Sequence, residues 1–415
     1  MKNELNERVN PVSKTAVATL IQLAAAGYER SAEILKRLGF SERDYAWSLG
    51  DRDQLDKTCM VACRESRYVA LNRVALDSGC GIIFDLPCGF VHRVFDMLEQ
   101  GRTYAGGDLP AVISVLRPVI LDMLPASQRE KARFAETDIT NYDSVAAALG
   151  SLEGPVCVCT EGLFVYLDEE EKKTVMENIR RLLAERGGCW LTVDPESLAR
   201  HMAVYTAIAG DRAQEILMKE MQGFTGKSGV DLVGKSEKYL HKGGGEAGCE
   251  SIGPYRKNGF LVEKIPFPAD CELRSYAFLQ PDTAEKVRKA LTGVHVWKLT
   301  ADPDYAPKEA GEAEKRFRLR TETEKGSLRF TLSGRLDSLS APRFLQAWEK
   351  EKAAGKIRSV EIGCADLQYV SSAGLRVLMM MRKALPGKPI VLTDVNREVR
   401  QILKTAGFED QFEIR

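Results

Sequence analysis

The chain has 415 residues, more than the roughly 100–200 of one compact domain, so we expect two or three domains. Hydrophobic residues make up 44% of it and charged residues 28%, which is ordinary for a soluble globular protein and excludes a wholly disordered chain. Lys plus Arg and Asp plus Glu both total 59, so the formal net charge is zero, which argues against nucleic-acid binding and against a basic membrane-binding surface.

The amino-terminal segment MKNELNERVNPVSK lacks the apolar core of a secretory signal, and no run approaches the roughly 18–20 apolar residues that span a bilayer. We therefore expect a cytoplasmic protein that does not bind membranes. Ten cysteines are too sparse for a disulfide scaffold, and the four histidines are not spaced as metal ligands, so no metal site is predicted. Cys59 and Cys63 could begin an iron–sulfur motif, but Ser66 stands where a third cysteine is needed, which favours two helical cysteines one turn apart.

Helical patterns come first along the chain. Residues 15–40 and 58–79 carry apolar residues at a spacing of three to four, which predicts helices. From residue 81 onwards, short apolar runs end in acidic or glycine-containing turns, and each is followed by a helical segment. Strands that alternate with helices predict an α/β fold with a mostly parallel sheet, and right-handed crossovers place helices on both of its faces.

The pattern becomes less regular further along. Residues 225–257 are rich in Gly, Lys and Ser and predict a loop or the margin of a lid. Residues 258–268 and 272–279 then predict two strands that close the sheet. Residues 299–316 combine Pro, Ala and charge with no apolar face, which is typical of a linker. A second alternation of strands and helices fills 317–415 and predicts a small, independent α/β domain.

An acidic residue ends each of the first four predicted strands: Asp85, Asp108, Asp138 and Glu161. In a parallel sheet the ligand lies beyond the carboxyl ends of the strands, so we expect these acids to share a site. Gly89 follows the first of them by four residues and lets the backbone approach a ligand closely, and Gly162 directly follows the last. Asp108 suits two ribose hydroxyls, and Asp138 suits an adenine amino group. Alone, each acid could be only a turn former or a helix cap.

The ligand that these residues indicate is a nucleoside without phosphates. The chain contains no GxGxxG and no GxxxxGK[ST], which disfavours a dinucleotide and a nucleoside triphosphate. S-adenosylmethionine has a ribose, which carboxylates can bind, and no phosphate, which would need many backbone donors. The pattern therefore suits S-adenosylmethionine. We therefore predict S-adenosylmethionine as the cofactor.

Four of these segments carry a family resemblance: DLPCGFVHR at 85–93, GGDLPAVISVLRPV at 106–119, ETDITN at 136–141 and TEGLFVYLDEEE at 160–171. They resemble the leucine carboxyl methyltransferase-like family of class I methyltransferases, over roughly residues 1–290. The resemblance implies a Rossmann-like, S-adenosylmethionine-binding methyltransferase core at 81–298 and a helical lid at 1–80. It also implies transfer of a methyl group to a small-molecule or protein acceptor that offers a carboxylate or hydroxyl.

The resemblance also implies which residues bind the cofactor, from its methionine end to its adenine: Asp85, Gly89, Arg93 for the methionine carboxylate, Asp108 for the ribose and Asp138 for the adenine, with Glu161 and Gly162 flanking the site. Tyr166 and His201 are candidates for the acceptor pocket, although packing alone accounts for both, and no catalytic residue is assigned. Pro87 departs from the family, which usually has a glycine of its glycine-rich turn at that position.

Three segments of the second domain carry another resemblance: FTLSGRLDSLSAPRF at 330–344, ADLQYVSSAGLRVLMMMRKAL at 365–385 and PIVLTDVNREVRQILKTAGFEDQFEI at 389–414. They resemble the STAS domain of anti-sigma factor antagonists, and the match runs through 317–415. The resemblance implies a module of bacterial regulation. Its expected partner is an anti-sigma factor or a serine kinase of the anti-sigma type.

In the STAS family the anti-sigma kinase phosphorylates a Ser or Thr at a helix N-terminus, just before a Gly-Leu pair. Aligning on that pair places the phosphorylated residue at Ser372 and the acid beside it at Asp337, while Ser371 replaces an Asp of the family. Unmodified, Ser372 can cap the helix by accepting a backbone N–H bond. A phosphate gains from the helix dipole but adds nearly two negative charges beside Asp337, which would release an acidic or apolar partner. The alternative is that Ser372 is only an N-cap.

These observations leave two hypotheses open. The first is a bifunctional cytoplasmic protein, an S-adenosylmethionine-dependent methyltransferase that carries a STAS module. The second is a first domain that senses the cofactor without catalysis, or a chain that acts only through protein binding as an anti-sigma factor antagonist. Intact Asp108, Arg93 and Glu161 favour the first hypothesis, and Pro87 favours the second.

Overall fold

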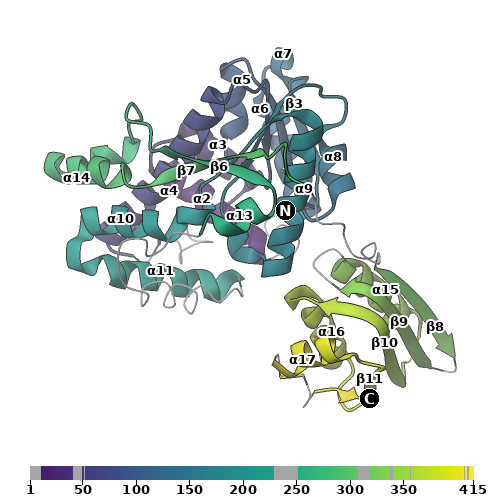
Figure 1. Ribbon diagram of the computed structural model, residues 1–415. Helices are drawn as coiled ribbons and strands as arrows, with labels where there is room; N and C mark the ends of the chain where they lie inside the picture. Colours follow the sequence, from purple (N-terminus) through teal and green to yellow (C-terminus); the bar gives the residue numbers. More distant parts are fainter. Residues whose placement is uncertain are drawn as a thin grey trace. The chain divides into compact units, whose positions relative to one another are not determined.

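The computed structural model describes residues 11–40, 49–50, 52–228, 251–306, 317–324, 326–336, 340–355, 357–405, 407–408 and 411–415. The chain divides into two compact units, Met1–Ala306 and Pro307–Arg415, which are called unit 1 and unit 2 below and are described separately. Each unit has its own sheet and its own apolar core (Figure 1). The predicted α/β fold class is therefore confirmed.

Unit 1 is built on a seven-stranded sheet with the order β3-β2-β1-β4-β5-β7-β6. Five strands are parallel: β1 (Ile82–Asp85), β2 (Thr103–Asp108), β3 (Ala132–Glu136), β4 (Val156–Thr160) and β5 (Gly188–Thr192). Their order is that of a doubly wound nucleotide-binding sheet, in which the winding reverses between β1 and β4. The antiparallel strands β7 (His295–Ala301) and β6 (Phe260–Pro266) complete the far edge.

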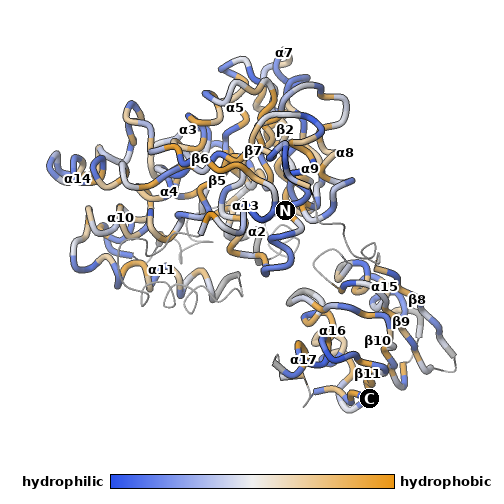
Figure 2. The backbone as a smooth tube through the Cα atoms, in the orientation of Figure 1, coloured by the Kyte–Doolittle hydropathy of each residue, from blue (hydrophilic) through white to orange (hydrophobic). Residues whose placement is uncertain are grey.

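Both faces of this sheet are buried because its central strands are short apolar runs. Alternate residues point to opposite faces, so Ile83 and Cys157 pack on one side while Phe84 and Val158 pack on the other. The first face packs against α4 (Gln54–Asp77), α5 (Arg93–Glu99) and α6 (Pro110–Met123). The second packs against α8 (Tyr142–Leu149), α9 (Glu169–Arg186) and the short α13 (Gly253–Lys257). Figure 2 shows hydrophobic residues along the central strands and hydrophilic residues in outlying helices such as α14.

Side-chain caps fix where the crossover helices begin. The carboxylate of Asp168 accepts the backbone amides of Glu170 and Glu171 at 3.0 and 2.9 Å, and the carboxylate of Glu171 accepts the amide of Asp168 at 3.0 Å. This reciprocal arrangement is a capping box and starts α9 directly after the turn that follows β4. Asn141 caps α8 in the same region of the sheet edge.

Additional helices lie outside the strand–helix alternation: α2 (Pro11–Ala25), α3 (Glu29–Leu38), α7 (Ala126–Arg129), α10 (Ser197–Ala209), α11 (Ala213–Ser228) and α14 (Pro281–Leu291). Helices α2, α3 and α4 form the helical region predicted for the start of the chain, and Cys59 and Cys63 lie one turn apart on α4. Helix α10 packs against α4, α11 and α14. Most of the predicted loop at 225–257 lies outside the described residues.

One of the two predicted closing strands is wrong. The segment 272–279 contains a 3₁₀ helix, η5 (Arg274–Phe278), and the second antiparallel strand is β7 instead. The carboxylate of Glu65 accepts the backbone amides of Arg274 and Ser275 at 2.7 and 2.9 Å. These amides are therefore not available for a sheet ladder. Strand β7 ends at Ala301, within the segment expected to be a linker.

Unit 2 has a five-stranded sheet with the order β12-β11-β10-β9-β8. Its elements in chain order are β8 (Arg318–Glu324), β9 (Ser327–Leu336), α15 (Ser340–Ala354), β10 (Ser359–Val370), α16 (Ser372–Ala384), β11 (Ile390–Thr393), α17 (Arg397–Thr405) and β12 (Glu413–Ile414). Strands β8 and β9 are antiparallel and the other pairs are parallel. Leu328, Phe330 and Leu332 of β9 are buried between exposed neighbours, and α15, α16 and α17 pack against the same core.

Candidate functional site

The carboxyl edge of the unit 1 sheet brings three of the predicted site residues into contact. Asp85 is the last residue of β1, Glu161 directly follows β4, and Arg93 is the first residue of α5. Arg93 Nη1 donates to Asp85 Oδ1 at 2.5 Å, and Arg93 Nη2 donates to Glu161 Oε2 at 2.9 Å. Because β1 and β4 are neighbours at the reversal point of the sheet, the two acids lie close enough to share one guanidinium.

Further polar side chains complete the surroundings of this buried ion pair. Arg93 is only 1% exposed, and its Nε donates to Asn72 Oδ1 of α4 at 2.6 Å. The hydroxyl of Tyr104 donates to Asp85 Oδ2 at 3.0 Å. Burial raises the pKa of Asp85 to about 6, although the charge of Arg93 and the bond from Tyr104 oppose this rise. Asp85 is therefore ionised at neutral pH and balances Arg93.

Arg67 of α4 is a member of this site that the sequence did not predict. Its Nε and Nη2 donate to Glu161 Oε1 at 3.1 and 3.0 Å. Burial opposes the ionisation of Glu161, but the charges of Arg67 and Arg93 outweigh it and hold the pKa of this carboxyl below its usual value. The pair Arg64 and Arg67, one turn apart in the helix predicted at 58–79, was the available signal.

Asp108 lies at the end of β2 in a separate set of contacts. Its Oδ2 accepts the backbone amide of Gly89 at 2.8 Å, and its Oδ1 accepts that of Leu109 at 2.7 Å. Burial raises the pKa of Asp108 to about 6 against the two amides, which lower it. Gly89 has a φ of 52°, a left-handed conformation that favours glycine. The structure therefore joins the predicted glycine turn to Asp108, the acid predicted to bind the ribose. The peptide bond between Leu86 and Pro87 in this turn is cis.

Asp138 makes local contacts after β3. Its carboxylate accepts the backbone amide and the hydroxyl of Thr140 at 3.0 and 2.9 Å. Its own amide donates to Ser144 Oγ at 3.0 Å. These are the contacts of a turn former, which is the alternative that the sequence left open for each strand-end acid. The adenine role of Asp138 stays a prediction.

Asp194, which follows β5, is a second acid that was not singled out. Its carboxylate accepts three successive backbone amides, those of Gly162, Leu163 and Phe164, at 2.6, 2.8 and 3.0 Å. It thereby fixes the turn after β4 that carries Glu161. The signal was its position, because Asp194 ends the fifth predicted strand as the other acids end the first four.

The two acceptor-pocket candidates lie in the helical part of unit 1. The hydroxyl of Tyr166 is hydrogen-bonded to Thr15 Oγ1 of α2, and burial raises the pKa of Tyr166 to about 12, so it stays protonated. His201 of α10 is 4% exposed, and its Nδ1 lies 2.7 Å from the carbonyl oxygen of Ser197. Burial lowers the pKa of His201, but the charge of Cys63 and a hydrogen bond to it outweigh burial and raise it.

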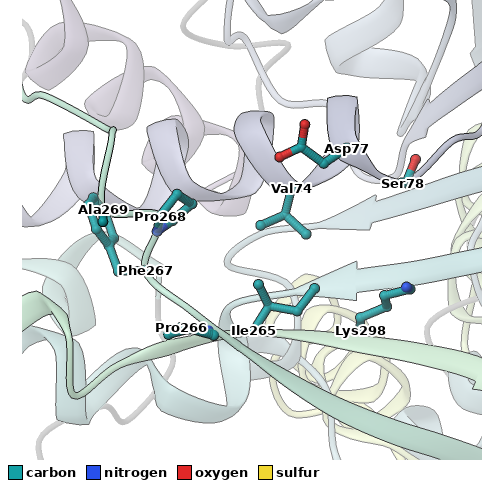
Figure 3. A pocket seen from close by; sticks show the side chains of 9 residues that line it. All are labelled: Val74, Asp77, Ser78, Ile265, Pro266, Phe267, Pro268, Ala269 and Lys298. Atoms are coloured by element: carbon teal, nitrogen blue, oxygen red, sulfur yellow. The ribbon is translucent and has the colours of Figure 1, made fainter.

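A cavity of about 350 Å³ is lined by residues of α4, β6 and β7 and the segment after β6: Val74, Asp77, Ser78, Ile265, Pro266, Phe267, Pro268, Ala269 and Lys298 (Figure 3). Asp77 and Lys298 carry the only charges of this lining, and the other residues are apolar or small. No predicted cofactor residue lines it. We therefore assign the candidate site to the strand ends and not to this cavity.

The start of α16 in unit 2 has a side-chain cap. The helix begins at Ser372, and the buried Ser371 precedes it. Ser371 Oγ accepts the backbone amide of Gly374 at 3.4 Å, and its carbonyl oxygen accepts that of Leu375 at 2.9 Å. Ser371, the residue before the predicted Ser372, therefore makes a capping contact at the start of α16. Asp337 and the side chain of Ser372 lie outside the described residues.

Gly374 allows α16 to start unusually close to the end of β9. A Cβ atom on Gly374 would lie 2.6 Å from the carbonyl oxygen of Leu336 and 2.8 Å from its Cγ. The same carbonyl accepts the backbone amide of Ser371 at 2.9 Å. The glycine of the Gly-Leu pair by which the family resemblance was aligned is therefore required by this close packing.

Comparison with solved structures gives similar proteins for both units. An anti-sigma factor antagonist from Mycobacterium paratuberculosis is 19% identical over 25% of this chain and 88% of that chain, with a TM-score of 0.23. A DUF574 family protein from Streptomyces avermitilis is 12% identical over 70% of this chain and 97% of that chain, with a TM-score of 0.40. A glycopeptide N-methyltransferase complexed with S-adenosylmethionine is 21% identical over 31% of this chain and 50% of that chain, with a TM-score of 0.26.

Three further findings bear on identity. The search of curated proteins gives no match. In the part of the chain that the structure describes, no helix has the length and apolar character needed to cross a membrane. Residues 319–414 match the family model described as "Mlab, STAS domain". The carboxyl-terminal part of this chain therefore matches a STAS domain.

Proposed function

We propose that unit 1 binds S-adenosylmethionine at the carboxyl edge of its sheet and transfers the methyl group to a carboxylate or hydroxyl acceptor in the cytoplasm. The observation that carries this proposal is the placement of Asp108. Each of its oxygens accepts one backbone amide, and a carboxylate oxygen can accept two hydrogen bonds. One acceptor position on each oxygen is thus left for the two hydroxyls of a ribose.

The other residues fit the same cofactor. The turn at Gly89 brings backbone next to Asp108 without a side chain between them. A guanidinium has five N–H groups, and Arg93 uses three of them on Asn72, Asp85 and Glu161. The remaining two are available for an anionic group such as the methionine carboxylate.

Bound S-adenosylmethionine supplies a methyl group on a positively charged sulfur, which is already an activated leaving group. The contribution of the chain is therefore to position the reacting groups and to exclude water. Arg67, Arg93 and Glu161 join α4 to the strand ends, so the helical region closes the site from one side. We propose that Tyr166 and His201 line the acceptor side.

The experiment is calorimetric titration of S-adenosylmethionine into the full chain. We expect micromolar affinity for the wild type and loss of binding in Asp108→Ala. The matched control is Glu136→Ala, an exposed acid at the end of the neighbouring strand β3, which should bind like the wild type. A wild-type chain that does not bind the cofactor, or an Asp108→Ala variant that binds it normally, would contradict the proposal.

We further propose that the STAS domain binds an anti-sigma-type regulator and that phosphorylation of Ser372 releases it. The support is the position of Ser372 as the first residue of α16, because the positive end of a helix dipole favours a phosphate. Incubation with a serine kinase of the anti-sigma type should add one phosphate to the wild type and none to Ser372→Ala. Ser371→Ala is the matched control and should still be phosphorylated. Equal labelling of wild type and Ser372→Ala would refute this site.

A further inference from the structure

Arg200 of α10 is a buried cation with unused hydrogen-bonding capacity. Its residue is 0% exposed, and its Nη2 donates to the carbonyl oxygen of His295 at 3.0 Å. Among the described residues, its Nε and Nη1 are buried and have no hydrogen-bond partner, and no carboxylate lies within ion-pair distance. Burial lowers the pKa of Arg200 to about 10, so the guanidinium is still charged at neutral pH.

Glu161 and Glu196 are the carboxylates whose charges act on Arg200, and both already have other partners. Glu161 is held by two other arginines. Glu196 accepts from Lys264 Nζ at 3.0 Å, from Trp297 Nε1 at 2.9 Å and from the backbone amide of His295 at 2.8 Å. Both acids favour the charged form of Arg200 from a distance, but among the described residues neither forms an ion pair with it.

The remaining neighbour that interacts electrostatically with Arg200 is Cys63. Burial opposes its ionisation, but the charge of His201 and a hydrogen bond to it lower its pKa. A Cys63 thiolate would therefore be balanced by a protonated His201, which follows Arg200 on α10. The nearby charge of Arg67 repels Arg200 and lowers the pKa of its guanidinium further.

An uncompensated buried cation costs several kcal/mol, so native proteins retain one where an anion or other polar group reaches it. Arg200 lies at the carboxyl edge of the sheet. Its partner His295 begins β7, which is antiparallel to β5, with Trp297 paired to Thr192 at the end of β5. The planar fork of an arginine matches a carboxylate, which accepts two parallel hydrogen bonds.

We propose that Arg200 is the receptor of a carboxylate that enters the active site on a ligand. The proposal rests on the proposed function, because the carboxylate belongs either to the amino-acid end of the cofactor or to the methyl acceptor. Arg93, which the family resemblance assigns to the methionine carboxylate, has only two N–H groups left after its bonds to Asn72, Asp85 and Glu161. Arg200 has the larger unused capacity of the two.

The test compares two thioether nucleosides that differ in their amino-acid end. S-adenosylhomocysteine carries a carboxylate and 5′-methylthioadenosine does not, and both are titrated calorimetrically into wild type and Arg200→Met. If the cofactor brings the carboxylate, the affinity for S-adenosylhomocysteine falls at least tenfold in the variant while that for 5′-methylthioadenosine stays unchanged. If the acceptor brings the carboxylate, both nucleosides bind Arg200→Met as they bind the wild type. Sodium benzoate then serves as the carboxylate probe. It should raise the Tm of the nucleoside-loaded wild type and leave the Tm of nucleoside-loaded Arg200→Met unchanged.

Two variants separate a binding role from a structural one. Arg102→Met is the matched control, because Arg102 also has a buried Nε without a partner but lies at the amino end of β2; it should keep the wild-type response to every probe. Arg200→Met should keep or raise the Tm of the ligand-free chain, since it removes an unpaired buried charge. If Arg200→Met does not fold, Arg200→Lys replaces it, because lysine keeps the charge but lacks the planar guanidinium. This variant should lose the same affinity or benzoate response as Arg200→Met.

The proposal is overturned if Arg200→Met, or Arg200→Lys in its place, responds to S-adenosylhomocysteine and to benzoate as the wild type does. It is also overturned if benzoate stabilises neither protein and both nucleosides keep their affinity. A wild type that binds neither nucleoside refutes the proposed function instead. In that case the benzoate response of the ligand-free chain, compared between wild type and Arg200→Met, still decides whether Arg200 binds a carboxylate.

Discussion

Different interactions stabilise the strand ends of unit 1 and the start of α16 in unit 2. In unit 1, buried ion pairs stabilise the strand ends, and Glu161 binds both Arg67 and Arg93. In unit 2 a neutral hydroxyl from Ser371 caps the helix, and the missing side chain of Gly374 allows close packing. A network of buried charges cannot lose one member without leaving another unpaired, whereas a neutral helix N-terminus can gain a negative charge. The first arrangement suits a preformed ligand site, and the second suits a site of modification.

Replacing Glu161 with Gln should have the largest effect, because it leaves two buried arginines short of their shared counter-ion. We expect the free energy of unfolding to fall by about 3–5 kcal/mol. Urea unfolding of Glu161→Gln, followed by circular dichroism, measures this loss. The matched control is Glu170→Gln, which removes an exposed ion pair with Lys173 and should cost less than about 1 kcal/mol. Equal losses in the two variants would show that the buried charges do not hold the site together.

The substitution Gly374→Ala tests the close packing of α16 against the end of β9 in unit 2. The added methyl group would lie 2.6 Å from the carbonyl oxygen of Leu336, so α16 or β9 must shift. We expect a loss of about 1–3 kcal/mol, the usual range for an overpacked site, measured by hydrogen exchange of the amides in α16. Gly355→Ala, at the end of α15 with open space around its Cα, is the control and should leave exchange unchanged. Unchanged protection in Gly374→Ala would mean that the close approach is not needed.

The sequence predicted the α/β class and the strand-end acids because both depend on local pattern. Short apolar runs specify buried strands, and the acids that follow them are placed at one edge by the parallel topology. It did not predict Arg67, whose partner Glu161 lies 94 residues further along the chain. Nor did it predict that Glu65 would bind the backbone at 274–275 and prevent a strand there. Contacts between segments far apart in sequence leave no local pattern from which to infer them.

The affinity of unit 1 for the cofactor should fall at acidic pH, whereas the uncharged cap at the start of α16 in unit 2 has no group that titrates in this range. The raised pKa of about 6 means that Asp108 gains a proton as the pH falls through 6, and a protonated carboxyl is a poorer acceptor for ribose hydroxyls. Below pH 6, affinity for S-adenosylmethionine should fall by up to about tenfold per pH unit. Calorimetric titrations between pH 5 and 7.5 measure this. Asp108→Asn should bind weakly with a flatter profile; a wild-type affinity that does not change with pH would contradict the assignment.

The effect of the same proton on folding has the opposite sign. The folded pKa of Asp108 lies above the ordinary value of 3.8, so the folded chain binds this proton more tightly than the unfolded chain does. Its contribution to stability is therefore fully present below pH 3.8 and is lost as the pH rises through 6. Urea unfolding of wild type and Asp108→Asn without cofactor should show a stability difference that changes with pH only in this window. A constant difference would mean that Asp108 does not titrate there.

The smallest effect is expected from the two serines at α16, and it separates capping from modification. Ser371→Ala removes the hydroxyl that accepts the amide of Gly374, and the loss of an N-cap typically costs about 1 kcal/mol. Ser372→Ala changes the first residue of the helix, and because Ser371 already accepts the amide of Gly374, we expect it to cost less than about 0.5 kcal/mol. Hydrogen exchange at Gly374 and Leu375 distinguishes the two variants. If Ser372→Ala exposed these amides as strongly as Ser371→Ala, Ser372 would be needed to hold the helix end and would be less free to carry a phosphate.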